Sequence, residues 1–165
     1  MTSQTIPARN APARTARSTA TAVAGWLLVV TGAGHATLVA VQSISGVPAS
    51  ERPIHQAMAA TTIPIAGIER SHWDLFVGFS LMMALMLVGL GALVLVVRRA
   101  APELVRGTRA VLTLLGLVLV PALLLSALLL PPPPIVLLGL ALVAVVVGLV
   151  RDPAVGQVES TAGQR

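Results

Sequence analysis

Four long apolar runs, separated by short polar segments, dominate the sequence. They cover about residues 20–41, 72–97, 108–130 and 134–150. A helix of about 20 apolar residues crosses a hydrocarbon core about 30 Å thick. Backbone amides inside a bilayer need internal partners, so each run is predicted to be a transmembrane helix. The pattern predicts an all-α polytopic membrane protein, a four-helix transmembrane bundle over residues 20–150.

The two ends of the chain lack this apolar pattern. Residues 1–19 and 154–165 are polar or small and show no periodicity, which predicts disordered tails. A cleaved signal peptide is the alternative interpretation of the first run, because arginines precede it. We favour a retained helix, since the run is long for a signal peptide and contains His35.

The segment 42–71 is the only long connection, and it is predicted to contain a short helix over about 51–62. Ser50 could cap this helix, and one of its faces would hold Ile54, Ala57, Met58 and Thr61. Pro64 and Gly67 would end it. The helix could lie in the membrane interface. The alternative is an ordered loop folded over the bundle.

Proline marks the second half of the chain. Pro121 lies inside the third run and predicts a kink, because it removes one helical hydrogen bond and clashes with the preceding turn. The four prolines at 131–134 predict a stiff polyproline connector, with the fourth helix beginning at Pro134. A connector this short makes the last two helices antiparallel neighbours.

Composition agrees with a membrane protein and narrows the expected partners. Hydrophobic residues make up 56% of the chain and charged residues 10%, whereas a soluble domain has about 25% charged residues. All eleven basic residues are arginines, and they flank the apolar runs instead of forming a nucleic-acid patch. The expected partner is therefore the lipid bilayer and not nucleic acid, and no protein partner is indicated.

The arginines are unevenly distributed among the connections. The 98–109 connection has four, the 131–134 connection has none, and the 42–71 segment has two that Glu51 and Glu69 offset. The positive-inside rule then predicts both tails in the cytoplasm of a bacterial cell, with the protein in the inner membrane. The 42–71 segment is expected to be extracytoplasmic.

Small and polar residues indicate which helix faces pack together. In the first run, one stripe holds Gly25, Thr31, Gly32, His35 and Gln42. In the second run, Asp74, Gly78 and Gly89 share a face. In the fourth, Ala141, Ala144 and Gly148 do the same.

His35 is the first candidate for chemistry, because titratable groups within a span are rare. It could ligate haem, hydrogen-bond a quinone or relay protons. A neutral histidine bonded to a neighbouring helix is the structural alternative. Asp74 and His72 begin the second run and could share a polar site with His35 if Asp74 lies at the same depth.

Asp74 also has a structural interpretation. Ser71-His72-Trp73-Asp74 fits the capping-box pattern, in which the serine and the acid each bond the other's backbone amide. Both roles can coexist. The chain has no cysteine, and His55, Glu69, His72 and Asp74 match no metal-binding spacing, so no metal is predicted. No cofactor is predicted either, with haem or quinone as the alternative.

Residues 25–90 resemble a family of small, uncharacterised four-span bacterial membrane proteins. The matching residues are Gly34-His35, Ala57-Met58, Gly67 and the stretch from Trp73 to Ser80, which fits W-D-x-[FY]-x-G-F-[SG]. The resemblance implies the four-span fold and carries no activity.

The sequence leaves three functions open. The first is a non-enzymatic integral membrane protein with an ordered outer segment. The second is a membrane oxidoreductase or a cofactor-binding subunit that uses His35 with Asp74. The third is a small-solute transporter, although such proteins usually contain internal repeats and broken helices.

Overall fold

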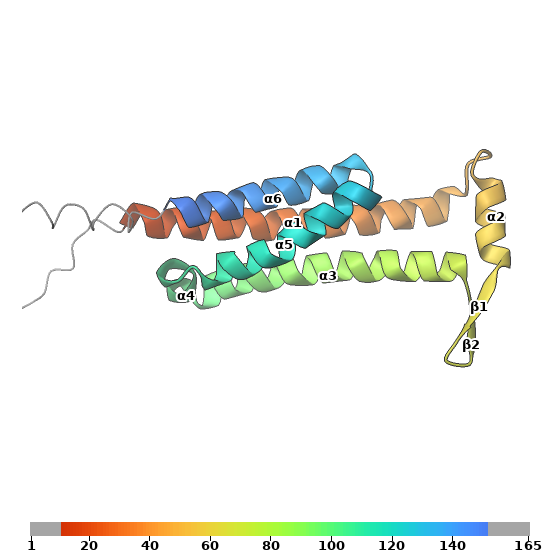
Figure 1. The fold of residues 1–165 in the computed structure, drawn as a ribbon, viewed down its shortest axis with the longest axis horizontal. Helices are drawn as coiled ribbons and strands as arrows, with labels where there is room; N and C mark the ends of the chain where they lie inside the picture. The colour runs from red at the N-terminus through yellow and green to blue at the C-terminus, as the bar shows by residue number, and fades with distance from the viewer. Residues whose placement is uncertain (1–10, 152–165) are drawn as a thin grey trace, which may run out of the picture. The chain divides into compact units, whose positions relative to one another are not determined.

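Four long helices make up most of the chain in the computed structural model, which describes residues 11–151 (Figure 1). They are α1 (Ala11–Ser45), α3 (His72–Ala100), α5 (Ala110–Leu129) and α6 (Pro132–Val150). Between α1 and α3 lie the short helix α2 (Arg52–Ala60) and the strands β1 (Thr62–Ile65) and β2 (Ile68–Ser71). The short helix α4 (Pro102–Gly107) precedes α5.

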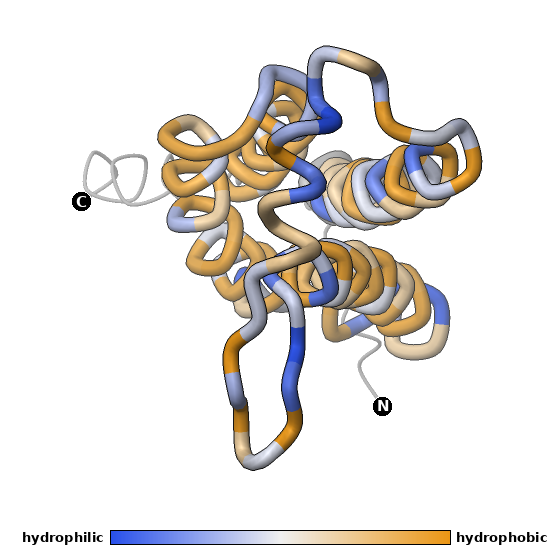
Figure 2. Tube along the Cα trace, turned by 90° about the vertical axis from the view of Figure 1, so that its right-hand side faces the viewer, coloured by the Kyte–Doolittle hydropathy of each residue, from blue (hydrophilic) through white to orange (hydrophobic). Residues whose placement is uncertain are grey.

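The predicted all-α class with four spans is confirmed. Each long helix contains a segment that is long and apolar enough to cross a membrane. The 20 residues of α5 and the 19 of α6 give lengths of about 30 and 28 Å, which match a hydrocarbon core of about 30 Å. The longer α1 and α3 exceed it. Hydrophobic positions dominate all four helices, whereas hydrophilic positions gather in the segment between α1 and α3 (Figure 2).

The chain divides into two compact units, and α1 and α3 each contribute to both. Among the described residues, unit 1 contains 11–28 and 91–151, and unit 2 contains 29–90. Unit 1 therefore combines the first half of α1 and the end of α3 with α4, α5 and α6. Unit 2 combines the remaining parts of α1 and α3 with α2 and the β-hairpin.

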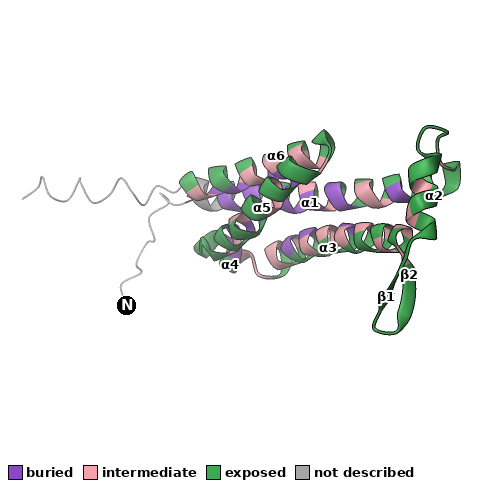
Figure 3. Cartoon of the chain, turned by 45° about the vertical axis from the view of Figure 1, so that its right-hand side comes forward, coloured by how far each residue is buried: buried purple, intermediate pink, exposed green. Residues whose placement is uncertain are grey.

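Unit 1 contains most of the buried side chains (Figure 3). Every helix in the unit contributes at least one apolar core residue: Ala20, Ala24 and Leu28 from α1, Val94 from α3, Val105 from α4, Leu112, Leu115 and Leu119 from α5, and Leu138, Ala141 and Val145 from α6. Unit 1 is thus a helical bundle with a continuous set of inward-facing positions. The many exposed leucines and valines on the other faces suit contact with lipid.

Small residues let the helices of unit 1 approach closely. A Cβ added to Gly148 would lie 2.6 Å from the Ala20 Cβ and 2.8 Å from a Leu112 methyl group. Ala141 on the same face of α6 is fully buried. The predicted packing face of α6 is therefore confirmed at Ala141 and Gly148. Small residues let membrane helices make close van der Waals contact. Packing leucine against leucine would stabilise them little, because leucine contacts lipid equally well.

Unit 2 contains an antiparallel β-hairpin that the sequence analysis did not predict. Thr62 pairs with Ser71 and Ile65 pairs with Ile68. The two turn residues, Ala66 and Gly67, both have positive φ, 50° and 81°, as a type I′ turn requires. Pro64 is tolerated because a two-stranded hairpin consists of edge strands only.

The close approach of α1 and α3 in unit 2 depends on Gly32. A Cβ there would lie 2.6 Å from the Ala84 carbonyl oxygen and 2.9 Å from the Val88 backbone nitrogen. The packing role predicted for Gly32 is confirmed. Gly78, in contrast, is exposed and has no atom within 4 Å of an added Cβ. Its predicted packing role is wrong, and α3 presents the face of Ala84 and Val88 instead.

Helix boundaries also correct the predictions. Residues 11–19, expected to be disordered, belong to α1; alanine there favours helix, and Arg17 and Ala20 are buried. The rest of the predicted tails lies outside the described residues. Prolines 132–134 form the first turn of α6 and not a polyproline connector, since first-turn amides have no helical acceptor to lose.

The helix α2 begins at Arg52, which is one residue too late for Ser50 to be its N-cap residue. Glu51 occupies the N-cap position, and it makes no side-chain capping hydrogen bond. The helix starts instead from a tight turn, in which the amides of Glu51 and Arg52 both donate to the Pro48 carbonyl. The predicted capping role of Ser50 is therefore wrong. Pro53 in the first helical turn supplies a preset φ.

Candidate functional site

Asp74 and Ser71 form both hydrogen bonds of a capping box at the start of α3. The Ser71 amide donates to the Asp74 carboxylate at 3.1 Å, and the Asp74 amide donates to the Ser71 hydroxyl at 3.0 Å. These bonds satisfy amides that the first helical turn leaves without acceptors. The negative carboxylate also interacts favourably with the helix dipole. The predicted capping role is confirmed by this geometry.

His72 is bound to the segment that joins α2 to the β-hairpin. Its Nδ1 lies 3.0 Å from the Thr61 carbonyl oxygen, and its backbone amide donates to the same oxygen at 3.0 Å. A carbonyl oxygen only accepts, so Nδ1 carries the hydrogen. The two bonds extend the pairing of β1 and β2 by one residue and attach the end of α2 to the start of α3. His72 therefore has a structural task in unit 2.

Aromatic contacts hold the same region together. The His55 ring meets the Trp73 ring edge-on, with centroids 4.4 Å apart. Trp73 in turn stacks on Phe76 with centroids 5.6 Å apart. The pairings join α2 to the first turn of α3, and contacts of this type stabilise by about 0.5–1.5 kcal/mol beyond burial. Trp73 is thus a packing residue of unit 2.

His35 differs from the other two candidate site residues, His72 and Asp74, whose side chains form structural hydrogen bonds. Its side chain is partly buried, and its Nε2 is buried without a hydrogen-bond partner among the described residues. It lies one helical turn beyond Gly32, on the side of α1 that faces α3. A buried imidazole nitrogen without a partner costs roughly 1–3 kcal/mol, so His35 is the position at which a ligand could gain most.

The structure does not bring His35 and Asp74 together. Gly32 packs opposite Ala84 and Val88, and α1 and α3 run in opposite directions within unit 2 (Figure 1). His35 is three residues farther along α1, which places it about level with Met83. Asp74 is nine residues from Met83, or about 13 Å along the axis. A direct hydrogen bond needs about 3 Å, so the equal depth that a shared polar site requires is not met.

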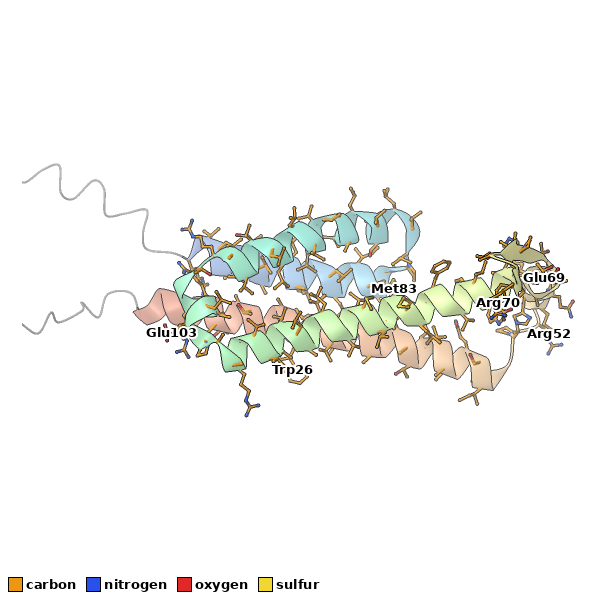
Figure 4. The ribbon with its side chains drawn as sticks, turned by 90° about the horizontal axis from the view of Figure 1, so that it is seen from below. Trp26, Arg52, Glu69, Arg70, Met83 and Glu103 are labelled. Carbon is orange, nitrogen blue, oxygen red and sulfur yellow. The ribbon has the colours of Figure 1, made fainter. Side chains whose placement is uncertain are left out.

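The remaining polar residues of unit 2 do not form a metal site. Among the described residues, no three histidine, aspartate or glutamate side chains are placed to hold an ion. Arg52, Glu69 and Arg70 lie around α2 and the hairpin (Figure 4) and are exposed. Their positions suit contact with water or lipid headgroups.

Thr61 has a role that the sequence did not predict, since it was expected only on one face of the short helix. Besides accepting from His72, it ends α2 by donating its hydroxyl to the Ala57 carbonyl at 2.8 Å. A signal was present in the sequence, since a two-residue turn at Ala66-Gly67 pairs residues equidistant from it, which sets Thr61 opposite His72. Recognition of the hairpin would have predicted this contact.

The four apolar helices and the locally bonded polar residues indicate a multi-pass membrane protein of the all-α class, one that contacts lipid along its spans. Comparison with known proteins adds no closer assignment. No family model, no curated protein and no solved structure matches the chain.

Proposed function

We propose that this chain is a non-enzymatic multi-pass protein of the bacterial inner membrane. Both termini lie in the cytoplasm, and α2 and the hairpin lie outside. One observation carries the non-enzymatic assignment. Asp74 and His72, two of the three candidate polar site residues, form hydrogen bonds that stabilise the start of α3. A catalytic pair would need these groups directed at a common reacting atom.

The charge distribution supports the orientation. Arg98, Arg99, Arg106 and Arg109 lie in or beside the connection between α3 and α5. The segment from 42 to 71 has two arginines and two glutamates. Arginine near the ends of spans is retained on the cytoplasmic side. The two ends of α3 thus differ in charge in the direction that places the segment from 42 to 71 outside.

Reporter fusions test the orientation. A cytoplasmic reporter fused to either terminus should be active, and a periplasmic reporter inserted at Gly67 should be active. Activity of a periplasmic reporter at either terminus would overturn the proposed orientation. Gly67 is chosen for the insertion because it lies at the exposed turn of the hairpin.

A second candidate function rests on the buried Nε2 of His35. In this alternative the chain is a cofactor-binding subunit that holds haem or a quinone through His35 alone. A visible absorption spectrum of the purified protein distinguishes the two functions for haem, and extraction with quinone analysis does so for quinone. Under the first function the protein is colourless, carries no quinone, and His35→Leu stays folded. A haem band lost in His35→Leu but retained in Thr37→Val, an exposed position on the same helix, would favour the second.

A further inference from the structure

One end of unit 1 carries nearly all of the unit's described charges. They comprise one carboxylate, Glu103, and six arginines, here called the arginine cluster: Arg17, Arg98, Arg99, Arg106, Arg109 and Arg151. The arginines come from α1, α3, α4 and the residues that border α5 and α6. Arg17 and Arg151 lie far in the sequence from the other four, so the fold gathers them.

Two sets of hydrogen bonds bring three of these segments to one level. Arg17 donates from Nη1 to the Arg106 carbonyl at 3.1 Å, which connects α1 to α4. Arg98 donates from Nε to the Ser18 carbonyl at 2.9 Å and to its hydroxyl at 3.2 Å, which connects α3 to α1. Charge-assisted bonds of this kind are stronger than neutral ones. They fix the arginine-bearing segments beside one another.

The end of α6 reaches the same level. Gly148 packs against Ala20 of α1 and Leu112 of α5, and Leu112 lies in the first turn of α5. Arg151 follows Gly148 by three residues, which carries it about 4.5 Å farther toward the cluster. All the segments of unit 1 therefore present arginine at one end of the bundle.

Part of this charge is accessible. Arg99, Arg106 and Arg151 are exposed, and Glu103 is the one carboxylate that the described part of unit 1 offers to them. Like charges gathered in this way repel one another, and an anion would relieve the repulsion. A guanidinium group presents a planar fork of donors that matches two oxygens of a phosphate.

Apolar side chains lie beside these arginines, and they favour a phospholipid over a nucleic acid as the bound anion. Val150 is 74% exposed beside Arg151, Val96 is 60% exposed two residues before Arg98, and Leu104 is 47% exposed on α4. A nucleic acid would cover the charges and leave these side chains in water. A phospholipid would place its phosphate on the arginines and its acyl chains on the valines and leucine.

We infer that the arginine cluster is a binding site for the phosphate of an anionic phospholipid headgroup. The exposed guanidinium groups of Arg99 and Arg106 donate to the phosphate oxygens, and Arg17 and Arg98 hold the surrounding segments in place. The inference rests on the membrane location given under the proposed function. It specifies a lipid class that the location alone does not.

The test uses the full-length protein in nonionic detergent. Native mass spectrometry measures binding of phosphatidylglycerol and of phosphatidylcholine to the protein and to R99Q/R106Q. The matched control is R52Q/R70Q, which removes two exposed arginines from unit 2. Phosphatidylglycerol should bind at least about tenfold more tightly than phosphatidylcholine. R99Q/R106Q should weaken phosphatidylglycerol binding about 25-fold, from about fivefold per arginine, and the control should leave it unchanged.

Three results of this measurement would overturn the inference: equal binding of the two lipids, an unchanged preference in R99Q/R106Q, or tighter binding of a single-stranded RNA oligonucleotide than of phosphatidylglycerol.

A second experiment varies the salt concentration and needs no variant. An increase from about 0.1 to 1 M shortens the screening length from about 10 to about 3 Å and should reduce the lipid preference of the unaltered protein. A preference that ignores salt also counts against the site. Failure of the membrane location would instead appear as a protein that is soluble without detergent.

Discussion

Gly32 offers the sharpest test of how α1 and α3 pack in unit 2. In Gly32→Ala, the new methyl carbon would lie 2.6 Å from the Ala84 carbonyl oxygen and within 2.9 Å of atoms of Val88. Two of these three atoms belong to the backbone, which cannot rotate away as a side chain can. The helices must therefore move apart, and a gap of about 0.5–1 Å already forfeits a quarter to a half of each van der Waals contact.

Gly34 supplies the matched control. It lies on the same helix, is exposed, and has no atom within 4 Å of an added Cβ. Both substitutions gain the same helix propensity, up to about 1 kcal/mol. The difference between the two variants therefore isolates the overpacking cost, which is about 1–3 kcal/mol. We expect Gly32→Ala to unfold more easily than Gly34→Ala by that amount.

Unfolding in mixed detergent micelles measures the difference. Trp73 belongs to unit 2 and stacks on Phe76, so its fluorescence reports on this unit once Trp26→Phe has removed the other tryptophan. Trp26 is 59% exposed and points away from its neighbouring helices (Figure 4), which makes that background mild. Equal unfolding free energies for Gly32→Ala and Gly34→Ala, within about 0.5 kcal/mol, would refute the close approach of the helices.

Three further substitutions test separate features. Gly148→Ala should destabilise unit 1 by about 1–3 kcal/mol relative to Gly139→Ala, which has open space around it; thermal unfolding of both variants, followed with Trp26 as the sole tryptophan, decides this, and equal midpoints would count against it. Ser71→Ala should cost about 1 kcal/mol through the lost capping bond; amide hydrogen exchange in the first turn of α3 should quicken relative to the unaltered protein, and unchanged exchange would exclude the cap. Ala66→Asn should stabilise the hairpin, because asparagine tolerates the positive φ that Ala66 adopts; a lower unfolding midpoint would contradict a type I′ turn.

The four spans could be predicted from the sequence because the physical constraint on them is strong. An uncharged run such as Leu75–Val97 can satisfy its backbone in lipid only as a helix. The capping box was equally predictable, since it depends on two residues three positions apart and on no distant contact. Local rules and the bilayer thus account for the helices and for the start of α3.

Features that depend on pairing between segments were harder to predict. Pro64 was expected to end the short helix, and a strand was not predicted there. A hairpin of two edge strands nevertheless accepts proline. The predicted packing face of α3 holds Asp74, Gly78 and Gly89, whereas the helix packs through Ala84 and Val88. Many small residues occur in apolar helices, so composition alone does not show which of them meet a neighbour.

The predicted polar site shared by His35 and Asp74 is absent for a related reason. A shared polar site requires His35 and Asp74 to lie at one depth, which the sequence left open. The register between α1 and α3, set by Gly32, places them about 13 Å apart along the axis instead. A register between two helices is a tertiary property, and no spacing within either helix specifies it.

Sided labelling of single cysteines tests the central claim, four membrane spans with the segment from 42 to 71 outside, most directly. The chain contains no cysteine, so Ile65→Cys in the hairpin, Gly107→Cys at the end of α4 and Pro131→Cys before α6 can each be labelled without a background signal. A membrane-impermeant maleimide added to intact cells should label Ile65→Cys and Pro131→Cys, and it should label Gly107→Cys only after the membrane is permeabilised. Labelling of Gly107→Cys in intact cells, or labelling of Ile65→Cys and Pro131→Cys from opposite sides, would contradict the account.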